Sequence, residues 1–217
     1  MSTLGFWSAP IGKKAVMAVT GLILFGFVLV HMIGNLQIYL GPAKLDEYAH
    51  LLRSTPALLW GTRIVLLISV FLHVIAAIQL ALQNKRARPQ GYVKKTAAGS
   101  TYASRTMYWS GPILFAFIVY HLLHFTTGQA HPHFQDGMVY QNVITAFQVI
   151  PVSLAYILSM VLLGMHLYHG VWSMFQSLGI NHPVYTPLLR KAAAVTSALI
   201  VIGNISIPVA VMAGVLR

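Results

Sequence analysis

Residues 15–35 read AVMAVTGLILFGFVLVHMIGN, a stretch that has no charged side chain and contains His31. A helix needs about 20 mainly apolar residues to cross a hydrocarbon core of about 30 Å. The uncharged run extends from 15 to 43, and further runs cover 64–84, 106–135, 137–189 and 192–216. Each run is long enough to hold one membrane-spanning helix. We therefore predict an all-α integral membrane bundle of five transmembrane helices, near 15–38, 58–83, 108–128, 150–178 and 192–215.

The composition agrees with this class. Of the 217 residues, 57% are apolar and only 8% are charged, whereas about a quarter of an ordinary soluble domain is charged. No linker or repeat divides the chain, so residues 1–217 are expected to form one transmembrane domain. The chain contains no cysteine, which excludes disulfides, cysteine-ligated iron–sulfur clusters and c-type haem attachment. It also lacks a glycine-rich phosphate-binding motif, so no catalytic residue for flavin or nucleotide chemistry is expected.

Positive charges gather on one side of the membrane if the five helices alternate in direction. That side carries Lys13, Lys14, Lys85, Arg86, Arg88, Lys94, Lys95, Arg105, Arg190 and Lys191. The other side carries all the acidic residues and the remaining cations, which are Asp46, Glu47, Asp136, Lys44, Arg53, Arg63 and Arg217. The positive-inside rule then predicts a multi-pass protein of the cell inner (cytoplasmic) membrane, with its N terminus in the cytoplasm. Because the cations flank apolar spans, membrane lipid or an acidic docking partner is expected to face them, and no nucleic acid.

Four of the predicted spans each contain a histidine far from their ends: His31, His73, His121 and His166. An ionisable side chain within a membrane usually faces the bundle interior and marks a functional site. Neutral imidazole is also the usual axial ligand of b-type haem iron. Four histidines on four helices can form two pairs. We therefore predict two b haems, each held by two histidines.

The depth of each histidine suggests how the four pair. At a rise of about 1.5 Å per residue, His31 lies roughly 24 Å and His121 roughly 20 Å from the inner membrane edge. His73 lies at roughly 15 Å and His166 at roughly 18 Å on the same estimate. The expected outer pair is His31 with His121, and the expected inner pair is His73 with His166.

Two neighbouring histidines compete for these roles. His124 follows His121 by three residues and His169 follows His166 by three, so each lies on nearly the same helical face as its neighbour. Depth slightly favours His124 for the outer site and His169 for the inner site. Spacing alone leaves both alternatives open.

Local sequence around the histidines adds a family resemblance. Residues 30–37 read VHMIGNLQ, Tyr120 directly precedes His121, and residues 166–173 read HLYHGVWS. The last string is similar to a His-x-x-x-Gly-x-Trp-Ser pattern whose first position is the ligand. Over essentially its whole length, the chain resembles the cytochrome b membrane anchor of the succinate dehydrogenase and fumarate reductase family, in its single-subunit, five-helix, dihaem form. The resemblance implies that His121 and His166 are ligands, and that His124 and His169 are not.

The same resemblance implies a function and a set of partners. A flavoprotein and an iron–sulfur subunit would dock on the cytoplasmic face, where the basic loop 84–107 lies, to form respiratory complex II of the tricarboxylic acid cycle. Electrons would pass between the iron–sulfur subunit, the two haems and a quinone, for which menaquinone is expected. This chain would then be a non-catalytic or quinone-site subunit of a multisubunit enzyme.

Further residues are candidates for contacts with these cofactors. Arg63 at the outer edge is a candidate partner for a propionate of the outer haem, and Lys13 and Arg105 are candidates for the inner haem. Gly170 could let a macrocycle approach the backbone, as could Gly26, Gly34, Gly111 and Gly164, although small residues also serve ordinary helix contacts. Candidate quinone contacts lie near the outer haem: Gln37, Glu47, His50 and His124.

Two other functions are compatible with intramembrane histidines. A cytochrome b561-like transmembrane electron carrier also distributes histidines over several helices, and it needs no soluble dehydrogenase subunits. A transporter with a histidine proton relay would bind no haem. The string at 166–173 and the number of helices favour the dehydrogenase anchor over the b561-like carrier, whereas purified protein without a haem absorption band would favour the transporter.

Overall fold

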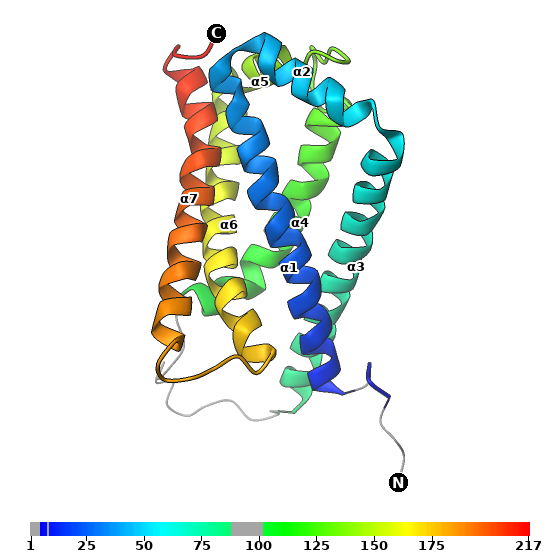
Figure 1. Ribbon diagram of the computed structural model, residues 1–217, viewed down its shortest axis with the longest axis vertical. Helices are drawn as coiled ribbons and strands as arrows, with labels where there is room; N and C mark the ends of the chain where they lie inside the picture. Colours follow the sequence, from blue (N-terminus) through cyan, green and yellow to red (C-terminus); the bar gives the residue numbers. More distant parts are fainter. Residues whose placement is uncertain (1–4, 8, 88–101) are drawn as a thin grey trace.

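The computed structural model describes residues 5–7, 9–87 and 102–217, and these contain helices and no strand (Figure 1). Most of the chain lies in five long helices, and shorter helices lie at one end of the bundle. In chain order the elements are α1 (Pro10–Asn35), η1 (Leu36–Leu40), α2 (Pro42–Arg53), α3 (Pro56–Arg86), α4 (Tyr102–Phe125), α5 (Val139–Phe147), α6 (Ile150–Ser177) and α7 (Thr186–Met212).

Five helices, namely α1 with its η1 extension, α3, α4, α6 and α7, are long and apolar enough to cross a membrane. Among the described residues, the predicted number of helices long and apolar enough to span a membrane is therefore confirmed, which is consistent with a multi-pass membrane protein. Successive long helices alternate in direction, and α7 ends at the end of the bundle opposite to the one where α1 begins (Figure 1). We call the end of the bundle where α1 begins the inner end, and the opposite end the outer end.

Some of the predicted helix bounds differ from those observed. The first helix begins at Pro10 and the third long helix at Tyr102, several residues before the expected 15 and 108. The difference arises because cations such as Lys14 and Arg105 continue the helix beyond the apolar run, as long basic side chains can extend from a helix end to the interface. Proline in the first turn of α1 also supports the early start, since it fits that position without losing a backbone hydrogen bond.

The short helices α2 and α5 were not predicted. Gly41, with φ of 96°, ends η1, and Pro42 then begins α2. Only glycine adopts such a backbone conformation readily, which makes the Gly-Pro sequence a recognisable turn. Both short helices lie at the outer end and cover a core cluster there: Ile38, Leu45, Tyr140, Ile144, Phe147, Tyr156, Ile207, Val211 and Leu216.

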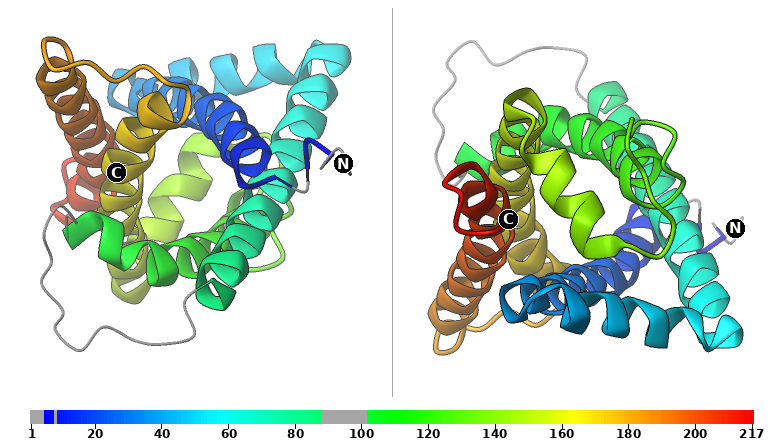
Figure 2. Two further views of the ribbon diagram at one scale, coloured as in Figure 1. Left: turned by 90° about the horizontal axis from the view of Figure 1, so that it is seen from below. Right: turned by 90° about the horizontal axis from the view of Figure 1, so that it is seen from above.

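The packing of the long helices places the histidines. Helix α1 packs on α3 and α6, α6 packs also on α4, and α7 lies outside against α6 and α1. Seen along the bundle axis, α1, α3, α4 and α6 surround a common centre, with α1 opposite α4 and α3 opposite α6 (Figure 2). Each of these four helices carries one of the four intramembrane histidines.

Candidate functional site

The four histidines form two pairs at the centre of the bundle. The ring centroids of His31 on α1 and His121 on α4 lie 5.9 Å apart, with the rings nearly perpendicular. Those of His73 on α3 and His166 on α6 lie 6.4 Å apart. These are the two pairs that the depth estimate predicts. Each pair joins helices that run in the same direction and face each other across the centre.

The competing histidines occupy other positions. His124 is almost fully buried, at 2% exposure, and its ring lies against Tyr120 and against His131, whose centroid is 5.0 Å away. Within the described residues, His169 has no ring contact with another histidine. His121 and His166 are therefore the members of each competing couple that face a histidine on another helix.

Hydroxyl groups from other helices contact one ring of each pair. Oγ1 of Thr20 lies 3.1 Å from Nδ1 of His73. The hydroxyl of Tyr156 on α6 lies 3.4 Å from Nδ1 of His121 and 3.0 Å from Nδ1 of His124. Neither Thr20 nor Tyr156 was predicted from the sequence to contact a histidine. A hydroxyl within an otherwise apolar span is the available signal, but its partner depends on helix packing.

A second buried histidine, His131, connects the outer loop to α5. Its Nε2 lies 2.9 Å from the backbone oxygen of Asn142, so that nitrogen donates. Its Nδ1 accepts the backbone N–H of His133 at 3.2 Å. Both ring nitrogens are thus used in hydrogen bonds, Nε2 to α5 and Nδ1 within the loop. This gives His131 a structural role next to His124.

The two pairs have the spacing that two imidazoles on one metal ion require. A metal–imidazole bond is about 2 Å long. Two rings on opposite sides of one iron then have centroids roughly 6 Å apart, close to both observed separations. Nδ1 of His166 is also buried with no hydrogen-bond partner among the described residues, and an orphaned polar atom in a bundle interior calls for an explanation. The side chains present therefore fit bis-histidine haem ligation.

The candidate glycines fall into two groups. A Cβ on Gly164 would meet Val201 of α7 at 2.4 Å, and one on Gly34 would meet Tyr48 at 2.8 Å, so these two glycines serve helix packing. A Cβ on Gly170 would meet nothing within 4 Å, and the same holds for Gly26 and Gly111. Only the second group leaves room beside the backbone.

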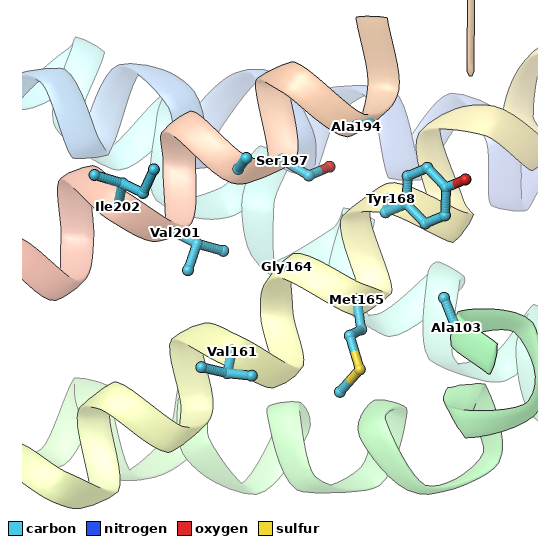
Figure 3. A pocket seen from close by; sticks show the side chains of 10 residues that line it. Ala103, Val161, Gly164, Met165, Tyr168, Ala194, Ser197, Val201 and Ile202 are labelled. Atoms are coloured by element: carbon cyan, nitrogen blue, oxygen red, sulfur yellow. The ribbon is translucent and has the colours of Figure 1, made fainter. Parts of the chain in front are cut away.

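An apolar groove of about 480 Å³ lies between α6 and α7, with Ala103 at one end (Figure 3). Gly164 and Val201 are among its lining residues, and Tyr168 and Ser197 supply its hydroxyl groups. None of the four paired histidines lines it. The groove is therefore separate from the histidine site.

The candidate propionate partners lie at the bundle ends. The Arg63 guanidinium lies 5.0 Å from the ring centre of Trp60, which is exposed on the same helix, and the Arg105 guanidinium lies 6.0 Å from the ring centre of Tyr102. Lys13, in contrast, is only 5% exposed. It lies near the start of α1, about two helical turns before Thr20 in the sequence. Lys13 is the most enclosed of the three cations.

The candidate quinone contacts do not form one cluster. Glu47 is exposed and pairs with Lys44 at 3.2 Å, and His50 is exposed on the same short helix. Gln37 is half-buried in η1, whereas His124 is enclosed within the bundle. No interaction joins any two of these four residues within the described part of the chain. The structure therefore brings the histidine pairs together but not the candidate quinone contacts.

No family model, curated protein or solved structure matches this chain. The family resemblance read from the sequence therefore stays a prediction.

Proposed function

We propose that this chain is the membrane-anchor cytochrome b subunit of a succinate:quinone oxidoreductase and binds two b haems. The observation that carries the proposal is the pair of facing histidine couples in one five-span bundle, with ring separations of 5.9 and 6.4 Å. The spacing is that of bis-imidazole ligation, and the two sites are stacked along the bundle axis. The string at 166–173 favours this family over other dihaem carriers.

In this proposal His31 and His121 hold the outer haem, and His73 and His166 hold the inner haem. When bound, each haem supplies a one-electron redox centre whose potential depends on its ligands and their surroundings. The chain fixes both centres within a water-poor interior by carrying their ligands on rigid helices. Lys13 is the best-placed cation for an inner propionate, because it is enclosed at the inner end of α1. Arg105 and Arg63 are the more exposed candidates for the inner and outer haem.

The proposed partners follow from the two ends of the bundle. The inner end carries the described cations Lys14, Lys85, Arg86, Arg190 and Lys191, and a flavoprotein and an iron–sulfur subunit would dock there. The central part of the basic loop 84–107, which holds Arg88, Lys94 and Lys95, lies outside the described residues. A quinone, which we propose to be menaquinone, would exchange electrons with the outer haem.

The proposed location is the inner membrane of the cell, with the N terminus in the cytoplasm. This orientation rests on the distribution of charge, because cations dominate the inner end and Asp46, Glu47 and Asp136 lie at the outer end. In this orientation the proposed docking surface lies on the cytoplasmic side, where the flavoprotein would interconvert succinate and fumarate.

The proposal is tested by the haem-to-protein ratio and the reduced-minus-oxidised spectrum of the native assembly. Two b haems per chain, together with copurifying flavin and non-haem iron, are the expected result. Two haems without flavin would instead indicate a b561-like electron carrier. Absence of haem would contradict both functions and favour a proton-translocating role for the histidines.

A further inference from the structure

Each histidine pair is asymmetric in its hydrogen bonding. Nδ1 of His73 contacts the hydroxyl of Thr20, and Nδ1 of His121 contacts the hydroxyl of Tyr156. Their partners, His166 and His31, have no such bond among the described residues, and Nδ1 of His166 is buried. One ring of each pair is thus held by a hydroxyl group from a different helix.

The direction of the Thr20 hydrogen bonds is set by the helix backbone. Oγ1 of Thr20 lies 2.7 Å from the carbonyl oxygen of Val16, one turn earlier in α1. A carbonyl oxygen only accepts, so the hydroxyl proton is donated to Val16 and the hydroxyl lone pair faces His73. Nδ1 of His73 must then carry the proton. Its Nε2 keeps a free lone pair, which is the form that can bind a metal.

Tyr156 assigns different roles to two histidines on the same face of α4. Its hydroxyl is closer to Nδ1 of His124, at 3.0 Å, than to Nδ1 of His121, at 3.4 Å. Donation to His124 and acceptance from His121 satisfies all three groups, because a phenol has one proton to give. His121 then keeps a free lone pair on Nε2. His124 carries its proton on Nε2 and cannot use that nitrogen as a ligand.

Accordingly, we propose that Thr20 and Tyr156 are the positioning residues of the two haem sites, Thr20 acting on His73 and Tyr156 on His121. This inference rests on the proposed function. Each hydroxyl fixes the tautomer and ring orientation of one ligand. By accepting the Nδ1 proton, it also makes the imidazole a stronger electron donor to iron, which stabilises the oxidised form. The two haems are thereby tuned by separate residues.

The first test is a redox titration of the purified native complex, followed by its absorption spectrum. Thr20→Val keeps the shape of the side chain but removes the hydroxyl, and we expect the midpoint potential of one haem to rise while the other is unchanged. Thr20→Ser keeps the hydroxyl and should restore the original potential. Thr196→Val is the matched control, because Thr196 makes the same 2.7 Å bond to a carbonyl one turn earlier, on α7 and away from the histidines.

The second test uses Tyr156→Phe, which should raise the potential of the other haem. Tyr140→Phe is its control, because the Tyr140 hydroxyl is bonded to the backbone of Arg217 instead of a histidine. Loss of one haem in Thr20→Val, but not in Thr20→Ser, would equally support the assignment.

Several outcomes would overturn the inference. Unchanged midpoint potentials in Thr20→Val and Tyr156→Phe would overturn it. A shift of the same haem in both variants, or a Thr20→Ser variant that behaves like Thr20→Val, would also overturn it. Each of these results would leave the proposed function intact. A wild-type complex without haem would overturn the proposed function and, with it, the inference. The wild-type spectrum therefore distinguishes the two failures.

Discussion

His73 and His166 face each other across the centre of the bundle, with ring centroids 6.4 Å apart, from helices that lie on opposite sides of it. Helix α3 packs mainly on α1, and α6 packs on α1, α4 and α7. The two histidine side chains therefore approach each other across the centre of the bundle. His31 and His121 repeat the arrangement across the other diagonal, nearer the outer end.

On the proposed function, removal of either member of the inner pair should remove one of the two haems. We expect His73→Ala and His166→Ala to lose the inner haem, because a single imidazole leaves one axial position of the iron without its ligand. Electron transfer to quinone should stop, since the path would lack a centre. Haem content per chain and the reduced spectrum measure the first effect, and succinate-dependent quinone reduction measures the second.

His169→Ala is the matched control for these variants. It lies on the same helix, three residues further on, and should keep both haems. If His166→Ala retained both haems and His169→Ala lost one, His169 would be the ligand instead of His166.

At the outer site the same comparison separates His121 from His124. We expect His121→Ala to lose one haem and His124→Ala to retain both, because His124 bonds to Tyr156 and stacks on His131 instead of facing His31. Removing the His124 ring leaves a buried hydroxyl without one partner, which costs about 1–3 kcal/mol. The melting temperature of His124→Ala should therefore fall while its haem content stays near two. Loss of a haem from His124→Ala, with an unchanged melting temperature, would instead indicate that His124 is the ligand and His121 is not.

The sequence was sufficient for the spans and for the pairing of histidines, because both depend on simple distances along a helix. A run of about 20 apolar residues and a rise of about 1.5 Å per residue give the depth of His31 or His166 without knowledge of neighbours. The choice between His121 and His124 is different. Two residues three apart lie on nearly the same face, so the choice depends on the rotation of the helix about its axis, which packing decides.

The remaining features depend on contacts between distant segments. Thr20 lies 53 positions from His73 in the sequence, and Tyr156 lies 32 positions from His124. Nothing local distinguishes these hydroxyls from others that bond only to their own helix, as Thr196 does. The short helix α5 was missed because its nine residues carry no charge and lie within a longer uncharged run.

The two glycines of α6 should respond differently to substitution. Gly164→Ala would place a methyl group against the stiff β-branched Val201, at 2.4 Å, and should destabilise the α6–α7 contact by about 1–3 kcal/mol. A Cβ added at Gly170 would meet nothing within 4 Å. Gly170→Ala should therefore leave the melting temperature of the haem-free chain unchanged or raise it. A fall in haem content in Gly170→Ala alone would indicate that a macrocycle lies against this residue. Equal destabilisation by both substitutions would contradict the packing described.

Asp46 holds the two short outer helices together. Its Oδ1 accepts the backbone N–H of Tyr140, in the first turn of α5, at 2.9 Å. The residue that precedes α5, Met138, cannot cap it, so α2 supplies the cap. We expect Asp46→Ala to lower the unfolding free energy by about 1–2 kcal/mol and Asp46→Asn to lower it less, because asparagine also caps helices well. Glu47→Ala is the control, since its ion pair with Lys44 is exposed and contributes little. Equal effects of Asp46→Ala and Glu47→Ala on thermal unfolding would contradict the capping role.

The orientation in the membrane can be tested without background labelling, because the chain has no cysteine. Glu47→Cys lies in α2 at the outer end, where the native side chain is 72% exposed, and Lys191→Cys lies near the start of α7 at the inner end. With the N terminus in the cytoplasm, a membrane-impermeant maleimide should label only the Glu47→Cys chain in intact cells. Both chains should be labelled after permeabilisation, which controls for accessibility of the thiols. The opposite pattern would invert the bundle and move the docking face to the other side of the membrane, although the histidine pairs would be unaffected.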